Sequence, residues 1–530
     1  MRSYYAHLET TAGSSAASKA ISSKPVFRSS AIFPMIKSPG IHSRILFMGY
    51  WILKRNIKEI AAVINLRSAD GKLISRSNLL IQEAKTYRVE LDDQLANAGL
   101  SLDTPFIGSL EIEFYSTVNL FFPYPATVVN YYGDHFSSVV HTAQRTYNDF
   151  EDMRNNSTTK VPESGFNIYA DENQEPFFGM VNGGEELPQT QLKMIFYNES
   201  KEILEHELDL GVAKPYQTRI VYPAREVPEL REFLKNKVGA AKIQFDLKWV
   251  FPRLLVGNIH HTLPAITITH TYYDCSAATS ESDYWRQSEP QWYPASLMVP
   301  VTISGEHFTN IYFYPIYSPS EFPIDMELYN AQGKLLGSKQ NLLLIKSPGG
   351  EYYQLPVKDI AKELNIPLET TLAARIIARE KNGKRIPSRI KMGLDMGYKL
   401  EHMPCNICTN LQPFNPPLDT KPKSFKWSPI LADQPGSTFW VMNSAPNIEY
   451  QKIDTVQLTF FREKDAAMIE RNVIVQAHGF VVIDVNHDEE LMEFFGGEVG
   501  WVTVVTTNPY TTTWYFTKNE SGVVGGDHGF

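Results

Sequence analysis

Cysteine is scarce in this chain. Only three of its 530 residues are cysteines, namely Cys275, Cys405 and Cys408. Small secreted domains that depend on disulfide bonds carry many more, so a disulfide framework is excluded as the basis of the fold.

Long apolar runs are also missing. The most apolar run near the N-terminus, Ile45 to Leu53, lies between Arg44 and Lys54, and it is far shorter than the about 20 residues that span a bilayer. Residues 1–24 are rich in serine and alanine but lack the apolar segment of a secretory signal, so we expect a flexible tail there. We therefore expect no membrane span and a cytoplasmic location, with export without a cleavable signal peptide as the alternative.

An excess of positive charge is absent as well. The chain carries 50 basic and 59 acidic residues, which gives a formal net charge of −9. A nucleic-acid partner would have no general electrostatic support from such a surface, so none is expected. The proportions of hydrophobic residues (43%) and charged residues (21%) are those of an ordinary globular protein.

The familiar catalytic motifs do not occur. The sequence has no GxSxG elbow, no Walker A loop, no HExxH helix and no GxGxxG dinucleotide fingerprint. No reaction can be named on this basis and no cofactor is expected, although β-sandwich glycosidases and lyases carry little local signature. The sequence favours a protein that is not an enzyme without deciding the question.

An internal repeat is present. An apolar run, a polar turn and a second apolar run recur as Ile64–Ile74, Met194–Leu204, Met326–Leu336 and Leu458–Met468. The turns are spaced by 130, 132 and 132 residues when these four positions are taken as equivalent: Gly71, Lys201, Gly333 and Asp465. Turn residues between β-formers indicate a β-hairpin, because glycine or asparagine adopts the positive φ that the turn requires.

Two further landmarks recur in the same order. Short helices that begin with acidic residues or proline are predicted at Asp92–Ala96, Pro228–Leu234, Lys358–Leu364 and His487–Phe494. The acidic run that begins at His487 is therefore interpreted as helix capping. Prolines open the last predicted strand of each copy at Pro125, Pro264, Pro387 and Pro509.

These landmarks predict an all-β fold made of four tandem immunoglobulin-like β-sandwich units, each with one short helix. After the tail at 1–24, the expected units are 25–150, 176–275, 295–404 and 425–530. Polar, proline-rich or serine-rich stretches at Asn148–Glu175, Ser276–Pro294 and Thr409–Ser424 are predicted to be the linkers.

One short motif has the composition of a metal site. His402, Cys405 and Cys408 lie close together in the sequence and together could fill three positions of a tetrahedral zinc site. The two cysteines could also form a redox pair, or they could be linker residues without a function. No second CxxC motif exists, and Pro404 favours a loop over the helix that a redox pair usually begins.

The end of the first unit has the polar residues of a ligand site. Tyr131, Tyr132, Asp134, His141 and Arg145 together could pair with an anion or hydrogen-bond a sugar. The alternative is that the charged members merely lead into the acidic linker. Histidines also occur late in three units, at 141, 402 and 528, whereas His270 is out of register; we interpret them as incidental.

These observations favour a non-enzymatic binding or scaffold protein. Tandem sandwich units present similar surfaces many times, which raises avidity for a protein or glycan partner. The alternative is a polysaccharide-active enzyme with its site between two units. It would need a cleft lined by two carboxylates, or by histidine and tyrosine, at only one interface.

Overall fold

The computed structural model describes residues 26–530 except 142–143, 148–162, 246, 252, 274–293, 317, 348, 370, 382–383, 385, 388–389, 400–402 and 413–422. The described chain is mostly β, as the sequence predicts. Eight antiparallel sheets of four or five strands form four pairs, and each pair comes from one continuous stretch. We refer to these stretches, 27–141, 163–273, 295–412 and 424–530, as the first to fourth units.

The first unit consists of the sheets β1-β6-β3-β4 and β5-β2-β7-β8. Its strands are β1 (Phe27–Lys37), β2 (His42–Met48), β3 (Ile60–Ser68), β4 (Leu73–Ile81), β5 (Thr86–Glu90), β6 (Phe106–Ser116), β7 (Thr127–Gly133) and β8 (Phe136–His141). The second unit consists of β13-β12-β15-β10-β19 and β14-β11-β17-β18. Its strands are β10 (Glu163–Ile168), β11 (Gln174–Val181), β12 (Gln191–Tyr197), β13 (Ile203–Asp209), β14 (Thr218–Val221), β15 (Gly239–Phe245), β17 (Leu255–His260), β18 (Ile266–His270) and β19 (Tyr272–Tyr273).

The third unit consists of β20-β25-β22-β23 and β24-β21-β26-β27. Its strands are β20 (Ala295–Val301), β21 (His307–Phe313), β22 (Phe322–Tyr329), β23 (Leu335–Ile345), β24 (Tyr353–Pro356), β25 (Leu372–Ala378), β26 (Ile390–Tyr398) and β27 (Cys405–Leu411). The fourth unit consists of β28-β33-β30-β31 and β32-β29-β34-β35. Its strands are β28 (Ser424–Ile430), β29 (Thr438–Asn443), β30 (Asp454–Arg462), β31 (Met468–Val475), β32 (Phe480–Asp484), β33 (Gly500–Thr506), β34 (Thr511–Lys518) and β35 (Val524–His528). A two-stranded sheet of β9 (Arg145–Thr146) and β16 (Val250–Phe251) joins the first unit to the second.

The strand order differs in detail from that of an immunoglobulin domain. An immunoglobulin sandwich pairs its first strand with its second. Here β1 pairs with β6, and β2 pairs with β5 and β7. The observed likeness to that fold is therefore the packing of two antiparallel sheets in each unit.

The predicted hairpins and helices form where the sequence places them. The hairpins are β3–β4, β12–β13, β22–β23 and β30–β31. The short helices are α4 (Leu91–Asn97), α7 (Leu230–Leu234), α8 (Val357–Glu363) and α9 (Glu489–Phe495), and two more are α3 (Tyr50–Arg55) and α6 (Pro223–Glu226). The Asp488 carboxylate caps α9 by accepting a hydrogen bond from Leu491 N, which agrees with the capping interpretation. None of the helices in the described ranges is long and apolar enough to cross a bilayer.

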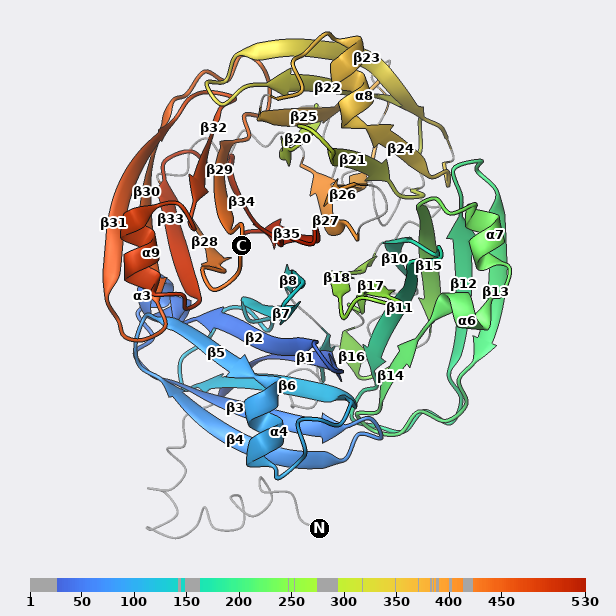
Figure 1. Ribbon diagram of the computed structural model, residues 1–530, viewed down its shortest axis with the longest axis vertical. Coiled ribbons are helices and arrows are strands. Elements are labelled where there is room, and N and C mark those ends of the chain that lie inside the picture. The colour runs from blue at the N-terminus through green and yellow to red at the C-terminus, as the bar shows by residue number, and fades with distance from the viewer. Residues whose placement is uncertain are drawn as a thin grey trace, which may run out of the picture.

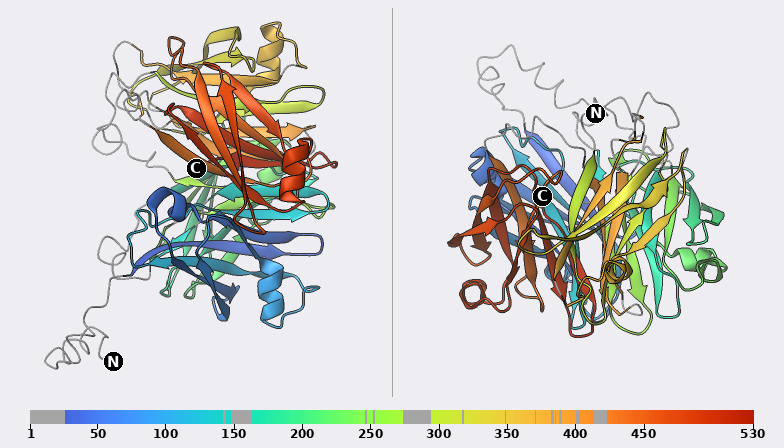
Figure 2. Two further views of the ribbon diagram at one scale, coloured as in Figure 1. Left: turned by 90° about the vertical axis from the view of Figure 1, so that its left-hand side faces the viewer. Right: turned by 90° about the horizontal axis from the view of Figure 1, so that it is seen from above.

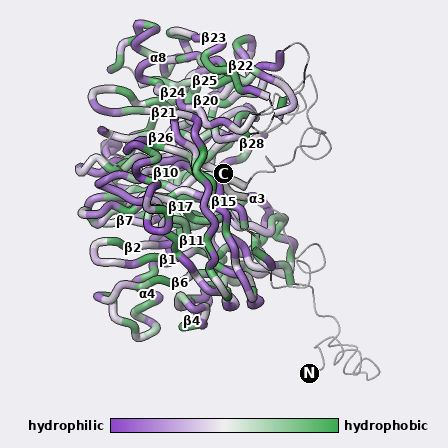
Figure 3. Tube along the Cα trace, turned by 90° about the vertical axis from the view of Figure 1, so that its right-hand side faces the viewer, coloured by the Kyte–Doolittle hydropathy of each residue, from purple (hydrophilic) through white to green (hydrophobic). Residues whose placement is uncertain are grey.

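Burial explains which strands lie outside and which lie inside. β4, β13 and β31 alternate exposed and half-buried residues, as expected of edge strands with one face in water. β11 and β20 are buried along their whole length. Figure 3 shows hydrophilic and hydrophobic residues alternating along the traces on the side of the second and third units.

The four units form a closed ring around a central axis (Figure 1), and Figure 2 shows the ring from two sides. The hairpin turn of one unit contacts the beginning of a strand in the next. Ala69 O, in the turn of the first unit, accepts a hydrogen bond of 2.8 Å from Thr218 N, where β14 begins. Ala331 O of the third unit accepts one of 3.1 Å from Phe480 N, where β32 begins.

The remaining two contacts complete the ring. The Thr86 hydroxyl, where β5 begins, donates 3.1 Å to Phe461 O at the end of the fourth unit's hairpin strand. Between the second and third units, Lys201 Nζ lies 3.0 Å from Glu351 Oε2. The buried apolar core is continuous across units, since one cluster joins the first and fourth units and another the third and fourth.

Three details differ from the sequence expectations. β10 lies inside the stretch expected as the first linker, so the second unit begins before Pro176. β27 begins at Cys405, after the expected end of the third unit at 404, and it reaches into the stretch expected as the third linker, so the third unit ends later than predicted. Within their sheets, Pro125, Pro387 and Pro509 precede the second-to-last strand in chain order (β7, β26 and β34), whereas Pro264 precedes the last strand of its sheet (β18). The irregular proline spacing therefore reflects two different strands.

Candidate functional site at the ring axis

The last strands of the two-layered units meet at the centre of the ring. β8 contacts both β18 and β35, and β27 contacts the same two strands (Figure 1). The approach of β35 to β8 requires a residue without a side chain, because a Cβ on Gly525 would lie 1.8 Å from Ser137 O. On the other side of β8, the Ser138 hydroxyl accepts a hydrogen bond of 2.8 Å from Ile268 N in β18.

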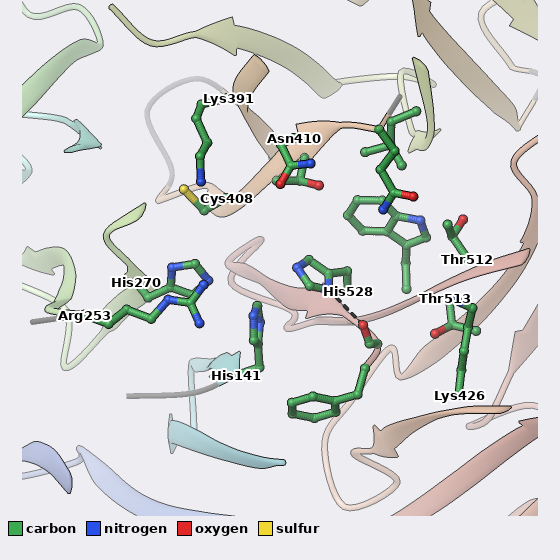
Figure 4. Close-up of a pocket in the computed structure, with 16 residues that line it drawn as sticks. His141, Arg253, His270, Lys391, Cys408, Asn410, Lys426, Thr512, Thr513 and His528 are labelled. Atoms are coloured by element: carbon green, nitrogen blue, oxygen red, sulfur yellow. Dashed lines mark hydrogen bonds between the residues drawn. The ribbon is translucent and has the colours of Figure 1, made fainter. Parts of the chain in front are cut away.

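A cavity of about 340 Å³ lies at this axis, and all four units contribute to it (Figure 4). Its volume falls in the range of ordinary ligand sites, about 300–1,000 Å³. The lining residues are His141, Arg253, His270, Leu297, Lys391, Cys408, Thr409, Asn410, Gln412, Lys426, Thr512, Thr513, Trp514, His528, Gly529 and Phe530. Among the described residues, the lining has three cationic side chains, three imidazoles and one thiol, and it has no aspartate or glutamate.

Three imidazoles from three different units lie together in the cavity. The His141 ring centroid is 4.7 Å from that of His270 and 4.4 Å from that of His528. Figure 4 shows these three rings around one space. Each histidine is the final residue of β8, β18 or β35. Because β8 contacts both of the other strands at the axis, their final residues lie together there.

Asp527 holds His141 in place. Its Oδ2 atom lies 2.7 Å from both the backbone N and the Nδ1 of His141. Burial alone would raise the pKa of this carboxyl group, but the charge of His141 and these hydrogen bonds outweigh burial and hold the pKa below its ordinary value.

Burial shapes the other titratable groups at the axis. It lowers the pKa of His528 to about 4 and that of His270 well below the ordinary value, and Arg253 lowers the latter further. Burial also raises the pKa of the Cys408 thiol to about 12, against the effect of Lys391 and Arg253. The positive charges of Arg253 and Lys391 therefore act directly on groups that line the cavity.

The expected ligand segment of the first unit is dispersed. Tyr131 is fully buried in the core, where its hydroxyl donates 3.0 Å to Pro34 O. The Tyr132 hydroxyl donates 2.9 Å to Glu90 Oε2, and its ring centroid lies 4.4 Å from the Arg44 guanidinium. Asp134 is exposed in the β7–β8 turn.

The other two residues of that segment also lie apart. Arg145 is buried in β9, with its guanidinium 5.7 Å from the Tyr124 ring centroid. Only His141 of the five reaches the axial cavity.

The predicted zinc motif is divided by the strand that carries it. Cys405 and Cys408 lie three residues apart in β27, and such residues point to opposite faces of a strand. The Cys405 thiol donates to Gly526 O at 3.2 Å within the core, whereas Cys408 lines the cavity. His402 lies outside the described residues. The geometry therefore disfavours a metal held by both thiols.

The sequence did not single out most of the cavity. Counted from the prolines, His270 is out of register with His141 and His528. Counted from the final residue of β8, β18 and β35, all three histidines match. The three cationic residues of the lining come from separate segments, and no motif in the surrounding sequence marks them as a site. They are Arg253, Lys391 and Lys426.

Comparisons with known proteins add little to this geometry. No family model and no curated protein matches the chain. One solved structure, described as a tetra-tandem repeat in the extending region of a large adhesion protein, aligns over 89% of this chain and 90% of its own at 8% identity, with a TM-score of 0.10. A TM-score this low carries no conclusion about fold or function.

Proposed function

We propose that this chain is a non-enzymatic, ring-shaped binding protein whose axial cavity holds an anionic group of a protein or glycan partner. The observation that carries the proposal is the lining itself. Arg253, Lys391 and Lys426 bring three positive charges to one cavity, and no aspartate or glutamate is among the described residues that line it. Carboxylate, sulfate and phosphate groups are the ligands that such side chains bind.

A buried donor supports the same ligand. Trp514 is 1% exposed and lines the cavity, and its Nε1–H has no hydrogen-bond partner among the described residues. A buried donor without a partner costs free energy that an acceptor on a ligand would recover. The Thr512 and Thr513 side chains line the same wall (Figure 4).

The alternative of a polysaccharide-active enzyme gains no support at this cavity. Glycoside hydrolysis ordinarily uses two carboxylates that flank the scissile bond. In the part of the lining that the structure describes, there is neither an aspartate or glutamate nor the pairing of histidine with tyrosine that the alternative requires.

Calorimetric titration with inorganic sulfate, glucuronate and an acidic peptide, each with a chelator present, tests the proposal. At least one ligand should bind saturably, and Lys391→Gln should weaken binding about 10-fold, the loss of about 1.4 kcal/mol from one charged contact. Lys58→Gln, which changes an exposed lysine outside the cavity lining, should bind like the parent. If none of the three ligands binds, or if both variants behave alike, the proposal is wrong.

A further inference from the structure

Backbone carbonyls fix the tautomer of two of the axial histidines. Nδ1 of His270 lies 2.8 Å from Thr271 O, and Nδ1 of His528 lies 2.9 Å from Gly529 O (Figure 4). A carbonyl oxygen can only accept a hydrogen bond, so each Nδ1 carries a proton and donates it. The other nitrogen, Nε2, has no hydrogen-bond partner among the described residues in either ring, and both rings line the cavity.

The protonation state of Nε2 decides whether these rings can hold an anion. In the neutral ring with a protonated Nδ1, Nε2 presents a lone pair, which repels an oxyanion. In the imidazolium form, Nε2 carries a proton and donates a charge-assisted hydrogen bond to the same oxyanion. A change of tautomer would move the proton to Nε2 but would leave the lone pairs of Nδ1 and the carbonyl oxygen facing each other. The ring therefore becomes a donor to the cavity by taking up a second proton.

The surroundings of both rings oppose protonation. Burial, together with the charges of His141 and Arg253, lowers the pKa of His528 to about 4. The Asp527 carboxylate acts in the opposite direction but does not outweigh these effects. Burial and Arg253 likewise hold the pKa of His270 well below its ordinary value. Both rings are therefore neutral in the neutral pH range.

The remaining titratable side chains of the described lining carry a positive charge or none. Lys391 and Lys426 are cationic, and burial raises the pKa of the Cys408 thiol to about 12, so this thiol stays uncharged. An oxyanion among these groups brings negative charge beside the imidazoles, and negative charge nearby raises the pKa of an imidazole. The anion therefore favours the protonated ring, and by reciprocity the protonated ring favours the anion.

We infer that the axial site binds an oxyanion together with a proton, and that His270 and His528 are the residues that make its affinity rise as the pH falls. The inference rests on the proposed function, since it concerns the same cavity and the same anionic ligand. It adds that the site is regulated by pH, with the two imidazoles as the titrating groups.

The direction of the pH dependence follows from proton linkage. Between the pKa of an imidazole in the protein alone and its higher pKa in the complex, the complex holds more protons, so affinity increases as the pH falls. For His528 this window begins at about pH 4. Below it the ring is protonated with or without the anion, and the affinity becomes constant. Each proton taken up changes the affinity by at most about tenfold per pH unit.

Calorimetric titration of the unmodified full chain with sulfate and with glucuronate, at constant ionic strength and with a chelator present, tests the inference. Both anions stay almost fully ionised from about pH 7.5 to about pH 5.5, so a pH dependence belongs to the protein. We expect the affinity to rise at least about 10-fold toward the lower pH. Titrations near pH 6.5 in two buffers of different ionisation enthalpy should show an uptake of at least about half a proton for each anion bound.

Variants assign the protons to particular residues. His270→Gln and His528→Gln each remove a titrating group and should reduce the gain in affinity toward low pH, and the double variant should abolish it. A purely structural effect would lower the affinity at both pH values without changing their ratio. The matched control His487→Gln changes a histidine that is 82% exposed and should keep the full pH dependence.

The outcomes separate the inference from the proposed function. Binding with equal affinity at both pH values, or without proton uptake, would overturn the inference and leave the proposed function standing. Absence of binding by sulfate, glucuronate and an acidic peptide at both pH values would overturn both. A pH dependence that is unchanged in the double variant would assign the protons to other groups and also overturn the inference. Because proton uptake is measured on the unmodified chain, a variant that fails to fold does not prevent the test.

Discussion

Arg44 in the first unit and Asp433 in the fourth form a two-pronged ion pair across the junction that closes the ring. Arg44 Nη1 lies 2.6 Å from Asp433 Oδ2, and Nη2 lies 3.0 Å from Oδ1. The arginine is 1% exposed, and its Nε donates a further hydrogen bond of 2.9 Å to Asn130. A buried guanidinium in this geometry depends on its carboxylate partner.

Removing that carboxylate should destabilise the whole molecule. We expect Asp433→Ala to lower the free energy of unfolding by about 3 kcal/mol, because Arg44 stays buried without its main partner. Urea unfolding followed by tryptophan fluorescence measures the change. Asp359→Ala breaks an exposed pair with Lys362 and should cost less than about 1 kcal/mol. Equal losses in the two variants would show that the pair of Arg44 and Asp433 contributes no more to the free energy of unfolding than an exposed ion pair does.

The hairpin turn of the third unit allows a test of the contact between units. Gly333 has a φ of +76°, and a Cβ there would lie 1.9 Å from Ala477 O of the fourth unit. Gly333→Ala should therefore lower the free energy of unfolding by about 3 kcal/mol through strain and displacement of the neighbour. Gly99 has a similar φ of +74° with open space around it, so Gly99→Ala should cost only about 1 kcal/mol. Thermal unfolding of both variants distinguishes the contact from the backbone strain.

Asp395 predicts a pH dependence at the contact between the second and third units. Its carboxylate accepts hydrogen bonds from Asn406, from Tyr169 and, at 3.4 Å, from Asn167 of the second unit. Burial nevertheless raises its pKa from 3.8 to about 6. Because the folded pKa exceeds the unfolded one, the stability that this group contributes is complete below about pH 4 and is lost as the pH rises to about 6.

The amount follows from the two pKa values. Moving a carboxyl pKa from 3.8 to about 6 corresponds to roughly 3 kcal/mol across this window. We expect Asp395→Asn to remove this part of the pH dependence, so that the stability difference between variant and parent changes mainly between pH 4 and 6. Denaturant unfolding at several pH values measures it. A difference that is constant from pH 4 to 7 would contradict the assignment.

The division into units can be tested by limited proteolysis. The polar and proline-rich stretches at 276–294 and 413–422 are expected to be cut first. Because neighbouring units share hairpin contacts and core residues, the fragments should still elute together from a native sizing column and separate only in denaturant. Early cuts inside the paired sheets, or fragments that separate without denaturant, would contradict this arrangement.

The sequence predicts those elements whose formation depends only on residues close together along the chain. The hairpins and the helix that Asp488 begins follow from local turn, capping and periodicity rules, and the structure has them in place. The division of the chain into sheets is harder to predict, since β10 falls in a stretch whose polar composition is typical of a linker.

The axial site could not be predicted in the same way. Its residues lie hundreds of positions apart, and only the closure of the ring brings His141 beside His528. Nothing in the composition of a single unit indicates whether four units form a string or a ring. The one indication in the sequence is a late histidine in several units, and it is obscured because Pro264 precedes a different strand from the other three prolines.

The contact between hairpin and strand has a consequence for assembly. It is a head-to-tail contact in which each unit offers one hairpin turn and one strand beginning, and closure at four leaves neither unused. A chain shortened by one unit would keep the same contacts but could not join its two ends at the same angle. Its unused hairpin turn and strand beginning would then meet those of another molecule, and the shortened protein would grow into open fibres whose length increases with concentration.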